Sequence, residues 1–177
     1  VKVSVGRFHS CLIYIGGGLA CTGRNDYGQL GHGDSTVRVT PVDTVLNNIK
    51  VKDVDIGEFY TCFQTMEDEL WCMGRNDWGQ LGLGDNAYRV TPVKVSLLGD
   101  KDVLAFSVGV YHICSVDIKN LVKCWGSNTY GQLGVGDYSK RNTPTLVTDQ
   151  GSDAKKISAG GRHTCFIKLD TSIWCMG

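Results

Sequence analysis

The sequence predicts an all-β protein, specifically a β-propeller of four-stranded blades, and three observations carry this prediction. One pattern of residues recurs about every 51 positions along the 177-residue chain. Each period holds four short stretches of strand character, too short for helices of ordinary length. The chain is also rich in turn residues, with 23 glycines. Repeated units of about 50 residues with four strands each are typical of propeller blades.

A glycine-rich segment carries the repeat. It occurs as GRNDYGQLGHGD at 23–34, GRNDWGQLGLGD at 74–85 and GSNTYGQLGVGD at 126–137. The glycines that open these segments, with one more at Gly177, are separated by 51, 52 and 51 residues. A Thr-Pro pair follows each segment, and a Gly-x-x-His or Gly-x-x-Tyr turn precedes it. These recurring residues, all at one spacing, establish an internal repeat.

Four strands are expected in each blade, and the second unit shows them most clearly. They cover residues 51–56, 61–65, 70–73 and 91–95. The fourth of these contains Pro92, which suits an edge strand because proline cannot donate a ladder hydrogen bond. A β-solenoid is the rival fold, but the repeat of a solenoid is usually shorter than this one.

The predicted blades cover about 1–48, 49–99 and 100–150, with three strands of a fourth, incomplete blade at 151–177. Propellers typically close with four to eight blades, more than these units supply. The chain is therefore expected to be part of a longer protein. The alternatives are a half-propeller that pairs with a second chain, and an open stack of blades that runs into a fibre.

The repeated residues of the glycine-rich segment are expected to be structural. Its glycines supply positive φ and close backbone approach, its glutamines bond the backbone between blades, and its leucines fill the gap between adjacent sheets. These residues are Gly28, Gln29, Leu30, Gly31, Gly79, Gln80, Leu81, Gly82, Gly131, Gln132, Leu133 and Gly134. Phosphate binding would need a helix N-terminus behind the glycines and usually a lysine, and neither follows.

The motif Gly-x-Asn-x-x-Gly-Gln-Leu-Gly-x-Gly, the Thr-Pro pair six residues after its Asp and the Gly-x-x-His-Ser/Thr turn resemble repeats of the regulator of chromosome condensation family. The resemblance covers essentially the whole chain and implies a seven-bladed propeller. A ring of seven such units needs about 360 residues, so the chain is expected to form about half of a seven-bladed ring. Two positions depart from the family pattern. The Trp that commonly precedes the blade glycine is retained only as Trp125, and Tyr60 stands where the other units have His. Both positions are expected to be packing sites.

The eight cysteines follow the same repeat and predict four disulfides. Each pair is ten residues apart, on the second and third strands of one blade: Cys11/Cys21, Cys62/Cys72, Cys114/Cys124 and Cys165/Cys175. A hairpin turn midway would place each pair directly opposite across an antiparallel ladder, about 4.5 Å apart and within disulfide range. Zinc would need four converging ligands, and buried free thiols are the other alternative. Disulfides indicate an oxidising compartment, so an extracellular or cell-surface location is expected.

Two sets of repeated polar residues invite a metal-binding interpretation. One carboxylate per loop, at Asp34, Asp85 and Asp137, is too few ligands for calcium, so turn capping is the preferred role. The equivalent histidines His9, His112 and His163 would form a ring, but Tyr60 interrupts it. Partly buried histidines that orient the turns are therefore expected, with no metal and no cofactor.

The predicted function is that of a non-catalytic extracellular propeller module that binds a protein or glycan, or that forms part of a surface or fibrous assembly of further copies. No catalytic set of residues recurs or clusters. Lys+Arg and Asp+Glu both number 18, which argues against nucleic acid as the partner. No apolar run approaches the roughly 18 residues of a membrane span. Contacts are expected at 35–39, 86–90 and 138–142, where the blades differ.

The resemblance also implies an alternative function. Nuclear members of the family act as guanine-nucleotide exchange factors for a small Ran-type GTPase. The cysteine pairs make this chain more similar to the extracellular branch of the family, such as the ectodomains of crinkly-type plant receptor kinases. The missing basic tail and the uniform repeat spacing also argue against the exchange factor.

Overall fold

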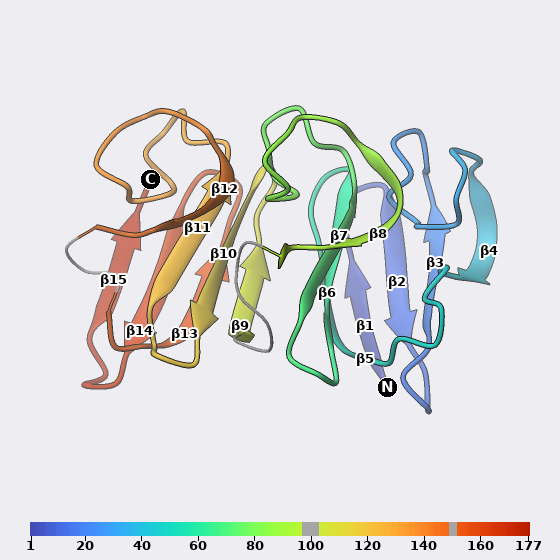
Figure 1. Cartoon of the computed structure of the whole chain (residues 1–177), viewed down its shortest axis with the longest axis horizontal. Coiled ribbons are helices and arrows are strands. Elements are labelled where there is room, and N and C mark those ends of the chain that lie inside the picture. Colours follow the sequence, from blue (N-terminus) through green and yellow to red (C-terminus); the bar gives the residue numbers. More distant parts are fainter. Residues whose placement is uncertain (97–102, 149–151) are drawn as a thin grey trace.

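The computed structural model describes residues 1–96, 103–148 and 152–177, and its strands form four antiparallel sheets that follow one another across the molecule (Figure 1). The first sheet contains β1 (Lys2–Val5), β2 (His9–Ile13), β3 (Leu19–Gly23) and β4 (Arg38–Asp43). The second contains β5 (Val51–Ile56), β6 (Tyr60–Thr65), β7 (Leu70–Gly74) and β8 (Arg89–Lys94). The third contains β9 (Val103–Val108), β10 (His112–Asp117), β11 (Val122–Gly126) and β12 (Arg141–Leu146). The fourth contains β13 (Ala154–Ala159), β14 (Thr164–Lys168) and β15 (Ile173–Met176).

The sheets confirm the predicted all-β fold of four-stranded units, and each follows the order of its strands in the sequence. The first strands of neighbouring sheets contact one another, β5 with β1 and β9, and β13 with β9, so these strands form the inner edges.

In the second sheet the fourth strand begins at Arg89, two residues before the predicted start, because Arg89 pairs with Gly74 beyond a register shift. The predicted blade boundaries near 99/100 and 150/151 lie outside the described residues. No helix long and apolar enough to cross a bilayer occurs in the described ranges.

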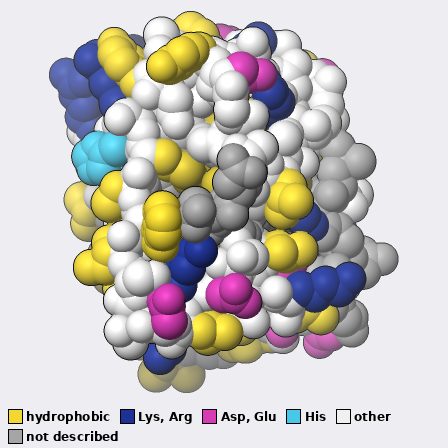
Figure 2. Space-filling view, turned by 90° about the vertical axis from the view of Figure 1, so that its left-hand side faces the viewer, with side chains coloured by type: hydrophobic (Ala, Val, Ile, Leu, Met, Phe, Trp, Pro, Cys, Tyr) yellow, Lys and Arg dark blue, Asp and Glu magenta, His cyan; other side chains and the backbone are white. Residues whose placement is uncertain are grey.

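The outer faces of the first and last sheets are exposed. Val3 and Val5 are 60% and 74% exposed, whereas the equivalent Val54 and Ile56 of the second sheet are 1% and 9% exposed. On the opposite side of the molecule, Figure 2 shows hydrophobic side chains among charged ones, and Ile173 of the last sheet is 69% exposed. The two outer faces therefore carry the kinds of side chain that pack between sheets elsewhere in the molecule.

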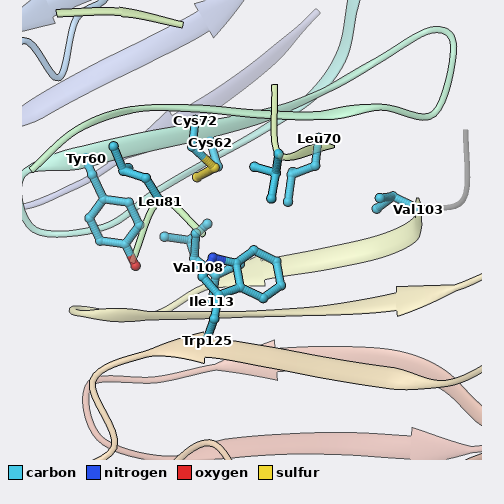
Figure 3. Close-up of a cluster of buried hydrophobic side chains, with 10 residues drawn as sticks. Tyr60, Cys62, Leu70, Cys72, Leu81, Val103, Val108, Ile113 and Trp125 are labelled. Atoms are coloured by element: carbon cyan, nitrogen blue, oxygen red, sulfur yellow. A yellow bond between two sulfur atoms is a disulfide. The ribbon is translucent and has the colours of Figure 1, made fainter. Parts of the chain in front are cut away.

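The hydrophobic core lies between the sheets, in three clusters that each join one sheet to the next. Each cluster contains one leucine of the glycine-rich segments, and Leu30, Leu81 and Leu133 have no exposed surface. Figure 3 shows the cluster between the second and third sheets, where Leu81 lies among side chains of both. Burial of this apolar surface is the main force that holds neighbouring sheets together.

Four disulfides join the second and third strands of the sheets: Cys11–Cys21, Cys62–Cys72, Cys114–Cys124 and Cys165–Cys175. The bonded cysteines are directly paired in the ladders, with Cα atoms 4.1–4.2 Å apart. In the first three sheets the cysteines are almost completely buried, whereas Cys175 in the last sheet is exposed. Each disulfide therefore locks one hairpin of one blade.

Hydrogen bonds also cross between the sheets. Nε2 of His9 lies 2.8 Å from Oγ1 of Thr61, and that hydroxyl donates to the carbonyl oxygen of Gln29 at 2.8 Å. Because the hydroxyl has one proton and gives it to the carbonyl, Nε2 must be the donor to Thr61. Nδ1 of His9 has no partner within the described residues, so protonation would leave a buried N–H without an acceptor, and the neutral ring with its proton on Nε2 is favoured. His112 repeats this arrangement with Thr164 at 2.8 Å.

Acidification is expected to destabilise the folded chain between pH 6.5 and about 4. Burial lowers the pKa of His9 and of His112 from 6.5 to about 4, so the unfolded chain binds protons in this range that the folded chain does not. The free energy of unfolding must then fall as the pH falls, by up to about 3 kcal/mol for each histidine. Urea unfolding between pH 7 and pH 4.5 measures this slope. A His9→Gln/His112→Gln variant should have a flatter slope, and an unchanged slope would contradict the assignment.

Candidate functional site

The turns and long loops of the four sheets gather at one end of the molecule, which is called the loop face below. First and third strands of an antiparallel sheet run in the same direction, so the segments that follow them leave the sheet at the same end. In Figure 1 this end is uppermost. The loop face consists of the turns 6–8, 57–59, 109–111 and 160–162 and the loops 24–37, 75–88 and 127–140.

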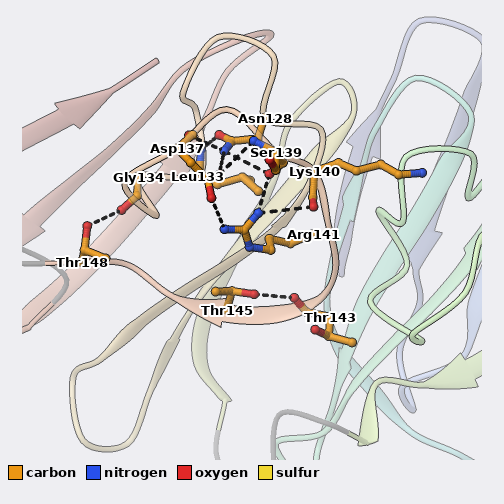
Figure 4. A network of polar contacts seen from close by, with 10 residues as sticks. All are labelled: Asn128, Leu133, Gly134, Asp137, Ser139, Lys140, Arg141, Thr143, Thr145 and Thr148. Atoms are coloured by element: carbon orange, nitrogen blue, oxygen red, sulfur yellow. Dashed lines mark hydrogen bonds and ion pairs between the residues drawn. The ribbon is translucent and has the colours of Figure 1, made fainter.

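Each long loop is held by an asparagine and an ion pair, as Figure 4 shows for the third sheet. Asn128 accepts a hydrogen bond from the Leu133 amide at 3.0 Å and donates to the carbonyl of Asp137 at 2.7 Å. The Asp137 carboxylate accepts from the guanidinium of Arg141 at 2.7 Å. The Arg141 guanidinium and the Ser139 amide hold the pKa of Asp137 below its usual value. The carboxylate is thus engaged in closing its own loop, the turn-capping role expected from the sequence.

The glutamines of the loops differ from the expectation. Each side-chain Oε1 accepts from a backbone amide two residues earlier in its own loop: Tyr27 for Gln29 at 3.0 Å, Trp78 for Gln80 at 3.0 Å and Tyr130 for Gln132 at 2.9 Å. The expected bond between blades therefore does not come from the glutamine side chain, because its oxygen is already hydrogen-bonded within its own loop. The main-chain carbonyl of Gln29 reaches the next sheet instead, through Thr61.

Close packing between a loop and the neighbouring sheet explains why position 28 must be glycine. Gly28 has a φ of +79°, and a Cβ there would lie 2.4 Å from the Cα of Val90. Any other residue would strain the backbone and collide with the start of the next fourth strand. Val90 belongs to one of the segments in which the blades differ, so this variable segment packs directly on the loop before it.

Arginines and aromatic rings alternate across the loop face, in an arrangement called the Arg–aromatic ladder below. Phe8 and Phe59 stack with ring centroids 4.7 Å apart, and the Arg24 guanidinium lies 5.3 Å from both centroids. The guanidinium of Arg75 lies 5.7 Å from the Phe59 centroid, 5.1 Å from Tyr27 and 6.0 Å from Tyr111. Cation–π contacts of this kind fix long arginine side chains in place. The ladder runs over the first three sheets.

A cavity of about 530 Å³ opens where the inner turns of all four sheets meet. Its charged lining residues are Arg7, Glu58 and Arg162. Glu58 accepts from Arg7 at 3.1 Å and from the hydroxyl of Tyr111, and its side chain is only 11% exposed. That bond to Glu58 raises the pKa of Tyr111. Arg162 is exposed, lies over Tyr130 at 4.6 Å and makes no ion pair within the described part of the chain. The cavity therefore offers more accessible positive than negative charge.

The segments predicted to make contacts, 35–39, 86–90 and 138–142, overlap the ends of the long loops of the loop face. Tyr88 contacts Tyr27 edge-on, with ring centroids 6.5 Å apart, and Asn86 donates to the carbonyl of Asp77 at 2.8 Å. Tyr88 and Tyr138 are 57% and 75% exposed. The structure thus brings the second of these variable segments, 86–90, beside the ladder. No group of three or more His, Cys, Asp or Glu side chains able to hold a metal ion was found among the described residues.

The Arg–aromatic ladder was not identified from the sequence. A signal was present, since the segment Gly-Arg-Asn-Asp carries Arg24 and Arg75, with Tyr27 or Trp78 three residues later. In the sequence these residues stand out only as part of the repeated glycine-rich segment. Their stacking partners, Phe8 and the other turn residues, come from different strands and in part from different sheets, so their proximity appears only in three dimensions.

Comparison with known proteins identifies the repeat. The family model for the regulator of chromosome condensation (RCC1) repeat matches residues 17–64, 67–116 and 122–167, which is more than half of the chain, and a second model of this repeat matches 1–29 and 103–132. The ultraviolet-B receptor UVR8 of Arabidopsis thaliana is 32% identical over 157 residues, which cover 88% of this chain and 36% of the receptor. The probable E3 ubiquitin-protein ligase HERC4 of Homo sapiens is 31% identical over 181 residues, which cover all of this chain and 17% of the ligase.

Solved structures show the same fold. Human WBSCR16 superposes with a TM-score of 0.87 at 23% identity, covering all of this chain and 48% of that one. Yeast RCC1 (Prp20), in its complex with Kap60, gives 0.82 at 19% identity, covering 99% of this chain and 43% of that one. The ectodomain of the Physcomitrella patens receptor kinase CR4 gives 0.65 at 18% identity, covering all of this chain and 41% of that one. The chain thus spans less than half the length of each of these proteins.

Proposed function

The chain belongs to the regulator of chromosome condensation (RCC1) repeat family, and from this premise we propose that it is a non-catalytic propeller module that binds a protein partner through its loop face. The observation that carries this proposal is the Arg–aromatic ladder. Arginine, tyrosine and tryptophan are the residues most enriched at the energetic centres of protein interfaces. Here arginines and tyrosines, together with Phe8 and Phe59, are gathered at one end of the molecule, where stacking contacts hold them in place.

The chemistry of the central cavity favours an acidic segment as the part of the partner that enters. Arg7 and Arg162 both line the cavity, and the Arg7 side chain is 73% exposed. Glu58 is shielded and already paired, so it does not repel an incoming carboxylate strongly. Guanidinium groups bind carboxylates through paired, charge-assisted hydrogen bonds. An Asp or Glu side chain of the partner, inserted between the two arginines, fits this arrangement.

A protein fits the loop face better than a glycan does. A sugar ring would stack on a free aromatic face, but Phe8 and Phe59 cover each other and both lie beneath Arg24. The most exposed aromatic side chains of the described residues, Tyr88 and Tyr138, lie in the long loops of the face, where a broad protein surface would reach them. Aromatic anchors surrounded by polar groups are the usual anatomy of protein interfaces.

The four disulfides support an extracellular or cell-surface location for this binding, because such bonds form and persist in oxidising compartments. Nucleotide exchange on a small GTPase is a cytosolic or nuclear activity, and the four disulfides do not favour those compartments. The likeness to yeast RCC1, at 19% identity, extends to the fold alone.

Binding of a defined acidic peptide tests the proposed partner chemistry. The full chain should bind a Glu- and Asp-rich peptide and should not bind a Lys-rich peptide of the same length. Its affinity for the acidic peptide should fall as the salt concentration rises. Arg7→Gln/Arg162→Gln should weaken this binding on the order of tenfold or more. Fluorescence anisotropy with a labelled peptide measures these affinities.

A matched control removes the same charge from the opposite end of the molecule. Lys119 and Lys155 are exposed there, and Lys119→Gln/Lys155→Gln should leave the affinity unchanged. Equal losses in both double variants would mean that net charge alone attracts the peptide. Equal binding of the acidic and basic peptides would also reject the proposed site.

A further inference from the structure

The three junctions between consecutive sheets are not built alike. In the first and third junctions a histidine of one sheet meets a threonine of the next, and the threonine hydroxyl donates to a glutamine carbonyl. The second junction has neither residue. Tyr60 replaces the histidine and Ile113 replaces the threonine. The Gln80 carbonyl therefore lacks the threonine hydroxyl that donates a hydrogen bond to the equivalent carbonyl in the other junctions.

Two other groups take over the missing hydrogen bonds in the second junction. The carbonyl of Gln80 accepts from Nε1 of Trp125 at 3.0 Å. The hydroxyl of Tyr60 points to the turn of the third sheet, 2.9 Å from the carbonyl of Gly109 and 2.8 Å from that of His112. Figure 3 shows Tyr60 and Trp125 in the same buried cluster, on either side of Ile113 and Val108. All polar atoms that the change affects are therefore paired.

The tryptophan occupies a slot that methionine fills in the other two junctions. A Cβ on Gly31 would lie 2.3 Å from Sδ of Met73, and a Cβ on Gly82 would lie 2.7 Å from Nε1 of Trp125. Both side chains thus pack on the equivalent glycine of the preceding sheet. Methionine fills this slot without a donor, which suffices where a threonine serves the carbonyl.

We infer that Tyr60, Ile113 and Trp125 form one coupled set that determines which sheets can pack together at the second junction. A sheet that presents tyrosine fits a following sheet that carries isoleucine and tryptophan. A sheet that presents histidine, such as His9 in the first, fits a following sheet that carries threonine and methionine. The face that each sheet presents to the next is thus selective for the sheet that follows it.

A mixed junction leaves buried groups unpaired. Histidine at position 60 would place its ring nitrogen against Ile113, which has no hydrogen-bonding group. Methionine at position 125 would leave the Gln80 carbonyl without its donor, because the side chain of Ile113 has none to offer. An unsatisfied buried donor or acceptor is costly, so mismatched sheets pack poorly.

This selectivity has a role in a chain whose units are so similar. Sheets with near-identical loops can pack in the wrong order during folding, which is a typical failure of repeat proteins. Because the second junction uses a different set, the third sheet is a poor substitute at the junctions that use histidine. The set thereby favours the correct order of the sheets.

A mutant cycle in the full chain tests the coupling. Tyr60→His, Ile113→Thr and Trp125→Met convert the second junction to the other set, singly and together. Each single variant should raise the unfolding equilibrium constant. The triple variant should unfold less than the product of the three single effects predicts, by a factor on the order of ten or more. A triple effect that equals this product within about twofold would overturn the inference.

A milder cycle at the first junction decides the question if the larger substitutions prevent folding. Thr61→Val and His9→Phe each remove hydrogen-bonding groups with little change of shape. Their combined effect on the unfolding equilibrium constant should fall short of the product of the single effects by several-fold. Either substitution alone already removes the hydrogen bond between the two side chains. Independent effects of the two substitutions would contradict a coupled set. Denaturant titration monitored by circular dichroism provides the equilibrium constants.

Discussion

Reduction of the disulfides is expected to unfold the protein under conditions in which the oxidised chain is folded. Each bridge joins residues ten apart and contributes about 2–3 kcal/mol by restricting the unfolded chain. Four such contributions are comparable to the whole free energy of unfolding of an ordinary domain, about 5–15 kcal/mol. Thermal unfolding with and without a phosphine reductant, followed by circular dichroism, measures the difference.

Replacing single pairs shows where the bridges matter most. Cys62→Ala/Cys72→Ala should be more destabilising than Cys165→Ala/Cys175→Ala, because the first pair is fully buried and leaves a cavity, whereas Cys175 is exposed. Peptide mapping without reduction should find Cys62 linked to Cys72. Complete alkylation of the unreduced protein would contradict the disulfides and the extracellular proposal with them.

Leu81→Ala is expected to lower the free energy of unfolding by about 2–5 kcal/mol. Leu81 has no exposed surface and lies in the cluster that joins the second and third sheets. Truncation removes apolar surface from both sheets and leaves a cavity that their rigid backbones cannot close. Leu104→Ala is the matched control, since Leu104 is 51% exposed and its loss should change stability by less than about 0.5 kcal/mol. A loss below about 1 kcal/mol for Leu81→Ala would show that the loop leucine does not hold the sheets together.

Much of the fold was predictable because it repeats. The strands of the second sheet lie within two residues of their predicted starts, since glycine and proline punctuate every unit at the same places. The cysteine spacing indicated the hairpin register, because residues that share a disulfide must face each other across the ladder. Local signals, repeated several times, were sufficient for this level of description.

The contacts between units could not be read from the same signals. Tyr60 and Trp125 were recognised as two separate departures from the pattern, and their shared junction appears only when the sheets are stacked. The glutamine carbonyl, rather than its side chain, reaches the next sheet because the side chain is used within its own turn. The ladder and the cavity of the loop face likewise join turns that are about 50 residues apart in the sequence.

The family repeat is offset from the sheets, and this offset bears on how such a chain can evolve. The matched residues 17–64 contain Leu30 of the first sheet together with Phe63 of the second, which belong to one cluster. The other two matches likewise contain both sides of one cluster, including Leu81 with Ile113 and Leu133 with Phe166. Duplication of one such stretch of gene therefore copies both sides of an interface whose side chains already fit each other. A propeller can gain a blade in this way without new substitutions at the interface between sheets.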